Sequence, residues 1–304
     1  MIAADHLAFL LNQPLGEVCR SGDLLARGLI LARKIYRPDF LIVFSDVSVE
    51  AEALGVRLEY PADKNPQPLR HVPVSEIRRV NMAESGRLPE LFRAAEICRA
   101  EFEKDFTLFF SLKDPLSLAA MTLGTEDFFQ LLVTDPAEAN EILHICCENQ
   151  IELVETIVKS GFIPFIGAPI STGDLIGATH FRNFAQPYLA RLFEAARKED
   201  SFACLHLCGK VSGLADCLGE LKPDLLSFED ADIVPLWNKL PDTIPMGYIP
   251  TDLFVYGNEK SVESSVKTCL RSLPPPFVLS TGCDLPAKSR KELVKVMMKA
   301  LMND

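Results

Sequence analysis

Short apolar runs recur along the chain, and each is followed by a turn of polar or small residues and then by a longer stretch with helical spacing. Seven such runs predict strands, at residues 40–44, 107–111, 163–167, 202–206, 225–228, 244–248 and 277–280. Several of them are apolar at every position, which is typical of parallel strands covered on both faces. Helical stretches at 137–159, 181–198 and 290–302 lie between or after them. The pattern therefore predicts an α/β protein with parallel strands and helical crossovers.

The turn after the first predicted strand separates two α/β architectures. A doubly wound sheet often carries a glycine fingerprint there, whereas this chain reads SDVSVEAEALG. Seven visible strands plus one weak or irregular strand fit a (β/α)8 TIM barrel, which typically takes about 250 residues as one unit. We therefore predict a single TIM-barrel domain over residues 1–304, with residues 1–38 as a helical N-terminal extension that could cap the bottom of the barrel.

Composition and charge narrow the classes of function. The chain has 304 residues, of which 48% are hydrophobic and 24% are charged, so it can bury a large core. Its formal net charge of -11 argues against binding to nucleic acid or to an anionic membrane surface, because both would repel it at long range. The first residues lack a basic stretch before their apolar run, and nowhere do about 18 apolar residues follow one another. We expect a cytoplasmic protein.

Nine cysteines make an odd count in a compartment that keeps thiols reduced, where they serve as core fillers, nucleophiles or metal ligands. Barrel enzymes place their chemistry in the loops at the carboxyl ends of the strands. This rule selects polar residues from the seven predicted strand ends: Ser45, Asp46, Asp114, Ser171, Asp174, His206, Cys208, Glu229, Asp230, Tyr248, Cys283 and Asp284. Two cysteines and one histidine belong to this set.

His206 and Cys208 are two residues apart at a strand end, so their side chains project to the same side of an extended chain. Cys283 follows the last visible strand and can reach the same point at the mouth of the barrel. One imidazole and two thiolates suit zinc and leave its fourth position for a substrate, as in a catalytic site. Spacing alone favours another interpretation, a hydrogen-bonded core histidine beside cysteines that act as small hydrophobic residues. Cys204 could replace Cys208 as a ligand, although its place within the strand favours packing.

The acids at the strand ends carry more than one interpretation. Glu229 ends the strand beside the one that carries His206, where it could be a fourth zinc ligand or could orient another ligand. An aspartate directly after a strand is often a turn or helix-cap residue, and for Asp114, Asp174 and Asp284 that role is as favoured as any other. The candidate substrate-binding residues share positions at the mouth of the barrel: Asp46, Asp114, Ser171 and Tyr248.

Longer segments extend these motifs into a family resemblance: PDFLIVFSDVSVEAEALG, SLKDPLSLA, APISTGDLI, LHLCGK, PDLLSFED and LSTGCDLP. With them, the chain resembles the superfamily of uroporphyrinogen decarboxylase and the corrinoid-dependent methyltransferases. In the methyltransferase branch, which includes methylcobamide:coenzyme M methyltransferases, an H-x-C motif and a distant cysteine bind zinc, and His206, Cys208 and Cys283 match these positions. The resemblance implies a zinc enzyme that moves a methyl group from a methylated corrinoid, supplied by a corrinoid carrier protein, to a small-molecule acceptor such as coenzyme M or tetrahydrofolate.

Two other functions stay open. The first is a tetrapyrrole decarboxylase like uroporphyrinogen decarboxylase, whose arginine-rich N-terminal signature is missing from the stretch LNQPLGEVCRSGDLLARG. Such an enzyme also needs basic groups to hold the carboxylates of its substrate, and no basic cluster stands out in the sequence of the strand-end loops. The second is a non-catalytic protein that binds zinc or a corrinoid on the same barrel. Both rank below methyl transfer in our interpretation.

Overall fold

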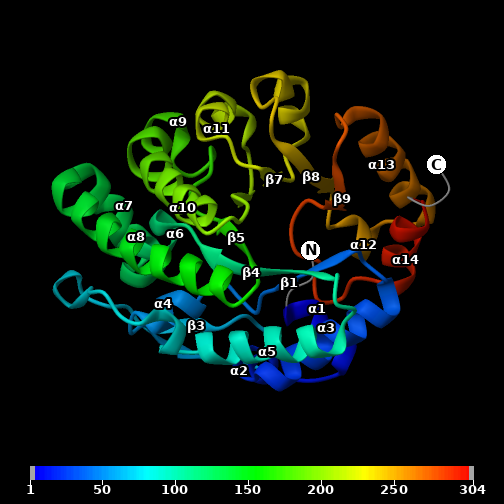
Figure 1. Cartoon of the computed structure of the whole chain (residues 1–304), viewed down its shortest axis with the longest axis horizontal. Helices are drawn as coiled ribbons and strands as arrows, with labels where there is room; N and C mark the ends of the chain where they lie inside the picture. Colours follow the sequence, from blue (N-terminus) through cyan, green and yellow to red (C-terminus); the bar gives the residue numbers. More distant parts are fainter. Residues whose placement is uncertain (1–3, 301–304) are drawn as a thin grey trace.

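The computed structural model of the chain describes residues 4–300 and shows one curled, seven-stranded parallel sheet (Figure 1). Its strands are β1 (Phe40–Val43), β4 (Thr107–Lys113), β5 (Ile163–Ala168), β6 (Cys204–Leu207), β7 (Leu225–Ser227), β8 (Ile244–Ile249) and β9 (Val278–Thr281). Each strand pairs with the next one in this order. All seven predicted strands are confirmed, and their carboxyl ends meet at one edge of the sheet, which forms the mouth.

Helices join successive strands and cover the outer face of the sheet, as the alternating pattern predicts. Figure 1 shows them following one another around the strands, from α8 through α10 and α11 to α13 and α14. The longer helices are α5 (Leu88–Glu101), α6 (Pro115–Leu123), α7 (Thr125–Thr134), α8 (Pro136–Lys159), α10 (Gln186–Lys198), α11 (Ala215–Leu221), α13 (Glu259–Ser272) and α14 (Lys291–Ala300). None of the helices within residues 4–300 is long and apolar enough to cross a bilayer.

Shorter helical segments complete the connections between strands. They are α4 (Val49–Ala53), η1 (Val74–Glu76), η2 (Met82–Glu84), α9 (Gly177–His180), the π-helical turn η3 (Phe181–Ala185), η4 (Ser212–Leu214), η5 (Ala231–Lys239) and α12 (Leu253–Tyr256). Two of the predicted helices, at 137–159 and 181–198, are confirmed. The third, at 290–302, is α14, and its last two predicted residues lie outside the described part of the chain.

The N-terminal segment is helical, as predicted, and forms α1 (Ala4–Leu11), α2 (Leu15–Arg20) and α3 (Gly22–Tyr36). The expectation that it caps the bottom of the barrel does not hold for these residues. α3 packs beside α5 and α14 in the outer layer, and the amide of Ala4 donates to the carbonyl of Ser45, just beyond the carboxyl end of β1. The apolar side of these helices is therefore buried against neighbouring helices, and α1 begins near the mouth.

A two-stranded hairpin interrupts the connection between β1 and β4. β2 (Arg57–Glu59) pairs in antiparallel fashion with β3 (Gln67–Arg70), and the pair lies outside the main sheet. Both strands are short and largely exposed, so their sequences lack the apolar run that marks the other strands.

β1 and β9 form the two edges of the seven-stranded sheet. Between them lies a cavity of about 330 Å³, lined by both edge strands and by Val294, Met297 and Met298 of α14. The α/β class is thus confirmed, whereas the described residues do not show the closed barrel of eight strands. At this seam, side chains of α14 line the cavity between the two edge strands.

Two hydrophobic cores flank the sheet because side chains alternate along each strand. The outer core lies between the sheet and the helices. The inner core fills the curl of the sheet with residues contributed by six strands: Ile42, Phe109, Phe165, Cys204, Leu225 and Met246. Above this apolar layer, the inward-facing positions become polar and open to the mouth.

Candidate metal centre

Side chains alternate between the two faces of a strand, and this alternation directs His206 into the interior of the curled sheet. On β6, Cys204 and His206 face inward, whereas Leu205 packs against the helices. The imidazole lies parallel to the ring of Phe165, with centroids 6.4 Å apart. Its Nδ1 is 3.1 Å from the hydroxyl of Ser227 on the neighbouring strand. The ring is therefore held by one strand on each side, with Nε2 directed to the mouth.

Cys208 and Cys283 reach the same point from the loops after β6 and β9. Cys208 Sγ lies 3.2 Å from His206 Nε2, Cys283 Sγ lies 3.8 Å from the same nitrogen, and the two sulfurs are 4.0 Å apart. Gly282 lets the second loop come this close, since a Cβ added there would lie 2.6 Å from the Cβ of Glu229. The histidine is buried and both cysteines are half-buried, so the triangle of ligand atoms opens to the mouth.

The three separations fit a zinc ion. Zinc–sulfur bonds of about 2.3 Å and a zinc–nitrogen bond of about 2.0 Å, in tetrahedral geometry, place two sulfurs about 3.8 Å apart and each sulfur about 3.5 Å from the nitrogen. When Nδ1 donates to Ser227, the lone pair of His206 Nε2 faces the sulfurs, as a metal-bound imidazole requires. Within residues 4–300, these three residues form the group of ligand atoms close enough together to hold a metal. They leave one tetrahedral position for a further ligand.

The contact between the two thiols shifts their pKa values in opposite directions. A hydrogen bond from Cys208 lowers the pKa of Cys283 to about 3, against the effect of burial, and the interaction with His206 contributes to the lowering. The same contact with Cys283, together with burial, raises the pKa of Cys208. A cluster with one thiolate and one retained proton can exchange that proton for a metal cation.

A cavity of about 100 Å³ opens onto this triangle. Apolar side chains form much of its wall, including Ile42, Phe44, Val47, Phe165 and Pro169. Two charged residues also line it, Lys113 at the carboxyl end of β4 and Asp284 beside Cys283. Burial and the charge of Cys283 raise the pKa of Asp284 to about 6.

Lys113 is a functional candidate that the sequence analysis missed. It is 3% exposed, and its Nζ lies 4.6 Å from the centroid of the Phe44 ring. Its backbone is fixed on both sides, because its amide donates to Glu50 at 2.9 Å and its carbonyl accepts from Gln150 at 2.5 Å. A lysine that ends an otherwise apolar run is the signal that could have identified it. Its side chain lines the same cavity as the two cysteines.

Comparison with known proteins agrees with the fold. A model of the uroporphyrinogen decarboxylase (URO-D) family matches residues 3–303. The chain belongs to the URO-D family. This confirms the resemblance that the motifs indicate.

Members of the URO-D family with two kinds of activity are similar to this chain. A methylated-thiol–coenzyme M methyltransferase of Methanosarcina mazei is 24% identical over 273 residues, which cover 87% of this chain and 71% of that protein. The methylcobamide:CoM methyltransferase MtbA of the same organism is 22% identical over 268 residues, or 85% of this chain and 78% of that protein. A uroporphyrinogen decarboxylase of Aquifex aeolicus is 20% identical over 290 residues, or 93% of this chain and 84% of that protein.

A solved structure supports the same architecture. A methyltransferase from Methanosarcina mazei superimposes with a TM-score of 0.89 at 18% sequence identity, covering 99% of this chain and 90% of the other. At that level of identity, the likeness shows that the two proteins share a fold.

Glu229 lies beside the triangle of ligand atoms that His206, Cys208 and Cys283 form. Its carboxylate faces the loop that carries Cys208. Its Oε1 accepts a hydrogen bond from the amide of Gly209 at 2.8 Å, and the side chain is exposed. The contact matches the second role predicted for Glu229, which is to orient another ligand. Its role as a fourth zinc ligand stays a prediction.

Asp46 follows β1 at the mouth, and its neighbours satisfy its carboxylate. It accepts hydrogen bonds from Arg87 at 2.6 Å, from the hydroxyl of Ser45 at 2.9 Å and from the amide of Ser48 at 3.0 Å. Burial alone would raise the pKa of Asp46, but Arg87 outweighs it and holds the pKa below its ordinary value. Arg87 also pairs with Glu52 at 2.6 Å. The structure gives Asp46 an internal role, and substrate binding by it stays a prediction.

Asp114 and Ser171 bond to each other rather than facing the cavity. The hydroxyl of Ser171 donates to Asp114 at 2.5 Å, and both side chains are fully buried. Asp114 also caps α6 by accepting from the amides of Leu116 and Ser117 at 3.2 and 3.3 Å. Burial raises the pKa of Asp114 despite these hydrogen bonds. The helix-cap role considered for Asp114 is confirmed, and substrate binding by the two residues stays a prediction.

Tyr248 lies on the outer side of β8. Its ring stacks on Phe228 at 5.7 Å and belongs to the outer core. Its hydroxyl interacts with Cys269 and Ser272 of α13, and burial raises its pKa. These contacts direct the side chain towards the helical layer, so the structure supports packing for Tyr248, and its predicted contact with substrate stays a prediction.

Cys204 packs in the inner core, as its place in the strand indicates. Burial raises the pKa of this thiol to about 12, and its neighbours in the core are apolar. The cysteines of α8, α11 and α13 are also buried: Cys146, Cys147, Cys217 and Cys269. Among the described cysteines, Cys208 and Cys283 differ in being half-buried and in facing the mouth.

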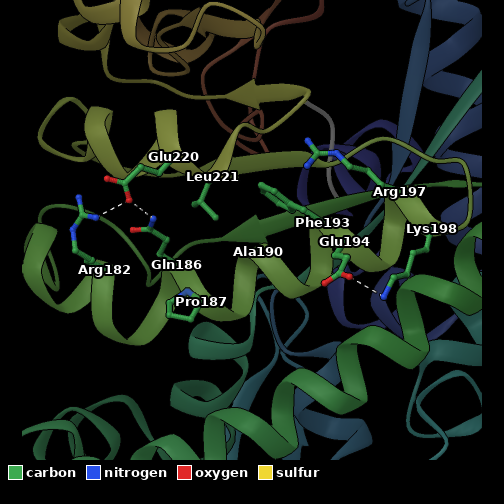
Figure 2. Close-up of a pocket in the computed structure, with 10 residues that line it drawn as sticks. All are labelled: Arg182, Gln186, Pro187, Ala190, Phe193, Glu194, Arg197, Lys198, Glu220 and Leu221. Carbon is green, nitrogen blue, oxygen red and sulfur yellow. Dashed lines mark hydrogen bonds and ion pairs between the residues drawn. The ribbon is translucent and has the colours of Figure 1, made fainter.

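A larger hollow, of about 670 Å³, lies on the helical layer. Figure 2 shows it between α10 and α11, with charged side chains that pair with one another. Glu220 accepts from Arg182 at 2.6 Å and from Gln186 at 2.8 Å, and Lys198 pairs with Glu194 at 2.8 Å. Its lining residues include no histidine or cysteine. The smaller cavity at the mouth, in contrast, is lined by His206, Cys208 and Cys283.

Proposed function

We propose that this protein is a zinc-dependent methyltransferase, which moves a methyl group from a methylated corrinoid on a carrier protein to a small thiol. The observation that supports it is the convergence of His206 Nε2, Cys208 Sγ and Cys283 Sγ within 4.0 Å of one another at the mouth of the sheet. The similarity to methylcobamide:CoM methyltransferases supports the same class of reaction. The residues of this chain would hold the zinc, and the corrinoid would arrive as a substrate.

Zinc bound at this site would lower the pKa of an acceptor thiol, so that the nucleophilic thiolate is present at neutral pH. In the proposed reaction, a bond forms between the acceptor sulfur and the methyl carbon while the cobalt–carbon bond of the corrinoid breaks. The electron pair of that bond stays on cobalt, and the thiol proton leaves to solvent. The products are a thioether and a corrinoid in the cob(I) state.

The protein's own residues would prepare this step in three ways. The hydrogen bond with Ser227 fixes the orientation of the His206 ring, so that Nε2 stays directed towards the sulfurs of Cys208 and Cys283. The apolar wall with Phe44 and Phe165 limits water around the reacting atoms and strengthens electrostatic interactions there. Lys113 places a cation in the same cavity. A compact cavity with a positive charge favours a short, negatively charged thiol, such as coenzyme M, over tetrahydrofolate as the acceptor.

The test uses zinc analysis and a methyl-transfer assay on the same preparations. Wild-type protein is expected to contain about one zinc per chain and to transfer the methyl group of free methylcobalamin to coenzyme M. Cys208→Ala and Cys283→Ala are expected to lose both the metal and the transfer. Cys204→Ala is the matched control, because this cysteine is buried one step deeper on the same face and packs in the inner core.

Each alternative has its own result in this experiment. Zinc binding without methyl transfer to a thiol or to a folate would indicate a non-catalytic zinc- or corrinoid-binding protein. Turnover of uroporphyrinogen that is unaffected by the two cysteine substitutions would indicate a decarboxylase. Equal zinc content in wild type, Cys208→Ala and Cys283→Ala would end the proposal.

A further inference from the structure

Four consecutive backbone amides follow Cys208, and each donates to a carboxylate from another loop. Gly209 donates to Glu229 at 2.8 Å and Lys210 donates to Asp174 at 2.9 Å. The next two amides, of Val211 and Ser212, donate to one oxygen of Asp230, each at 2.9 Å. The loop after β6 is thus fixed by acids from the loops after β5 and β7.

This arrangement compensates for the lack of regular structure after β6. Between Leu207 and η4 the chain has no strand or helix to hold it. Gly209 adopts a φ of +61°, and a Cβ added there would lie 2.8 Å from Asp174 Oδ2, so the turn and the carboxylate fit closely together. A loop of this kind would sample several conformations without the three acids. Cys208 is its first residue, so the same acids determine where the sulfur lies.

Asp230 carries the largest share of these contacts. It is 6% exposed, and its second oxygen accepts from the amide of Asp232 at 3.1 Å. Burial would raise the pKa of Asp230, but the hydrogen bonds from Ser212 and Val211 outweigh burial and lower it. The carboxylate is therefore charged at neutral pH and can keep all three amides in place. Glu229 acts nearer the sulfur, because its partner is the residue directly after Cys208.

We propose that Asp230 and Glu229 are positioning residues of the metal centre. Through the backbone of the loop, they keep Cys208 Sγ close to His206 Nε2 and Cys283 Sγ. The inference rests on the proposed zinc site, and it assigns Glu229 a hydrogen bond to Gly209 in place of a bond to the metal. Because the loop is preorganised, zinc binding does not have to order it. Loss of the acceptor oxygens of either side chain therefore weakens metal binding while the fold is retained.

The test compares zinc affinity, by chelator competition, with the spectrum of the cobalt(II)-substituted protein, whose thiolate-to-cobalt bands report the sulfur ligands. Glu229→Ala is expected to weaken zinc binding by about 10-fold or more, because the amide of Gly209 loses its acceptor. Glu229→Gln keeps an acceptor oxygen and is expected to retain nearly full affinity. If Glu229 were itself a zinc ligand, Glu229→Gln would lose affinity along with Glu229→Ala.

Asp230→Asn extends the test to the buried acid. Both oxygens of Asp230 accept from backbone amides, and an asparagine has one acceptor oxygen, so this variant is expected to reduce zinc affinity by about 10- to 100-fold and to weaken the thiolate bands. Asp232→Asn is the matched control, since the carboxylate of Asp232 is exposed and pairs with the side chain of Lys210 at 3.2 Å. Thermal unfolding of the metal-free proteins monitors the fold. Should Asp230→Asn not fold, the two variants at the exposed Glu229 decide the question.

The possible results separate this inference from the proposed function. Wild-type protein that binds no zinc or cobalt(II) would refute the zinc site and with it the role of the loop. Wild-type protein that binds metal, with Glu229→Ala and Asp230→Asn equal to it within about twofold, would refute the positioning role alone. Loss of affinity in Glu229→Ala with recovery in Glu229→Gln would support it.

Discussion

Two buried polar clusters lie at the mouth of the sheet, and they differ in how their charges are balanced. In the first, Arg87 pairs with Asp46 and with Glu52, each at 2.6 Å, so that both carboxylates have a cationic partner. In the second, the sulfurs of Cys208 and Cys283 lie 4.0 Å apart, and their contact lowers the pKa of Cys283 and raises that of Cys208. The acids of the first cluster have a cationic partner within the protein, whereas the second is the cluster for which we propose a bound zinc ion.

This difference shows what makes a residue at a strand end a candidate for chemistry. Asp46 and Cys283 occupy comparable places beyond β1 and β9, and sequence position alone does not tell them apart. The interaction partners of the two side chains distinguish them. The carboxylate of Asp46 accepts hydrogen bonds from Arg87 and from two serines. The sulfur of Cys283 faces a second sulfur and an imidazole nitrogen. Substitutions in the first cluster should therefore change the stability of the fold, whereas substitutions in the second should change the binding of a ligand.

Breaking the first cluster should have the largest effect on stability. Arg87→Met leaves the carboxylate of Asp46 buried without its cation, which costs about 3–5 kcal/mol for a buried ion pair. The free energy of unfolding, measured with urea on the metal-free protein, is expected to fall accordingly. Arg93→Met is the control, because Arg93 pairs with Asp23 in an exposed position and its loss should change little. A loss no greater than that of Arg93→Met would show that the buried cluster does not support the fold.

Zinc should stabilise the protein through the second cluster. At a free zinc concentration about 100 times the dissociation constant, binding adds about 2.7 kcal/mol to the free energy of unfolding. Wild-type protein is expected to show this gain and Cys283→Ala to lose it. Arg87→Met, although less stable, should keep the full response to zinc. An equal response in Cys283→Ala and wild type would contradict the assignment of the second cluster.

Lys113 sharpens the comparison, because it brings a cation to the second cluster without belonging to the ligand triangle. Lys113→Met should leave zinc affinity nearly unchanged. It should weaken binding of 3-mercaptopropionate by about tenfold or more, because a hydrogen bond to a charged group contributes about 1.5–3 kcal/mol. Binding of the neutral 2-mercaptoethanol should hardly change, and cobalt(II) spectra can follow both thiols. Equal losses for the two thiols would argue against recognition of charge by Lys113.

The smallest expected effect concerns how the free energy of unfolding depends on pH in the acid range. The folded pKa of Asp46 lies below its ordinary value of 3.8, so the unfolded state binds the proton more readily. The stability that Asp46 contributes is complete above about pH 4 and is lost as the pH falls through the lower folded pKa. Arg87→Met should remove part of this acid dependence, measured as the free energy of unfolding between pH 5 and pH 3. An unchanged slope would show that Arg87 does not set the pKa of Asp46.

The sequence is sufficient for the seven strands of the parallel sheet and for the pairing of His206 with Cys208, because both depend on short-range patterns. An apolar run between turns marks a buried strand wherever it occurs, as at residues 163–167 and β5. His206 and Cys208 are separated by one residue, and a strand end places both on one side. Their convergence with Cys283 follows from the parallel order of the sheet, which brings all strand ends to one edge.

The sequence is not sufficient where a partner comes from a distant segment without a recognisable pattern. Arg87 lies 41 residues from Asp46 in a connection that contains a short exposed hairpin, so the ion pair has no local signal. The same applies to Ser171 and Asp114, which are 57 residues apart. The seam between β1 and β9 is also invisible in the pattern, because the side chains of α14 that line it look like those of any amphipathic helix.

X-ray absorption at the zinc edge of the purified wild-type protein tests the central claim most directly. The expected first shell contains two sulfurs at about 2.3 Å and at least one nitrogen at about 2.0 Å, and addition of an acceptor thiol should increase the sulfur count from two to three. A shell made only of nitrogen and oxygen atoms, or a sulfur count that the substitution Cys283→Ala leaves unchanged, would contradict the assignment of His206, Cys208 and Cys283 as the metal centre.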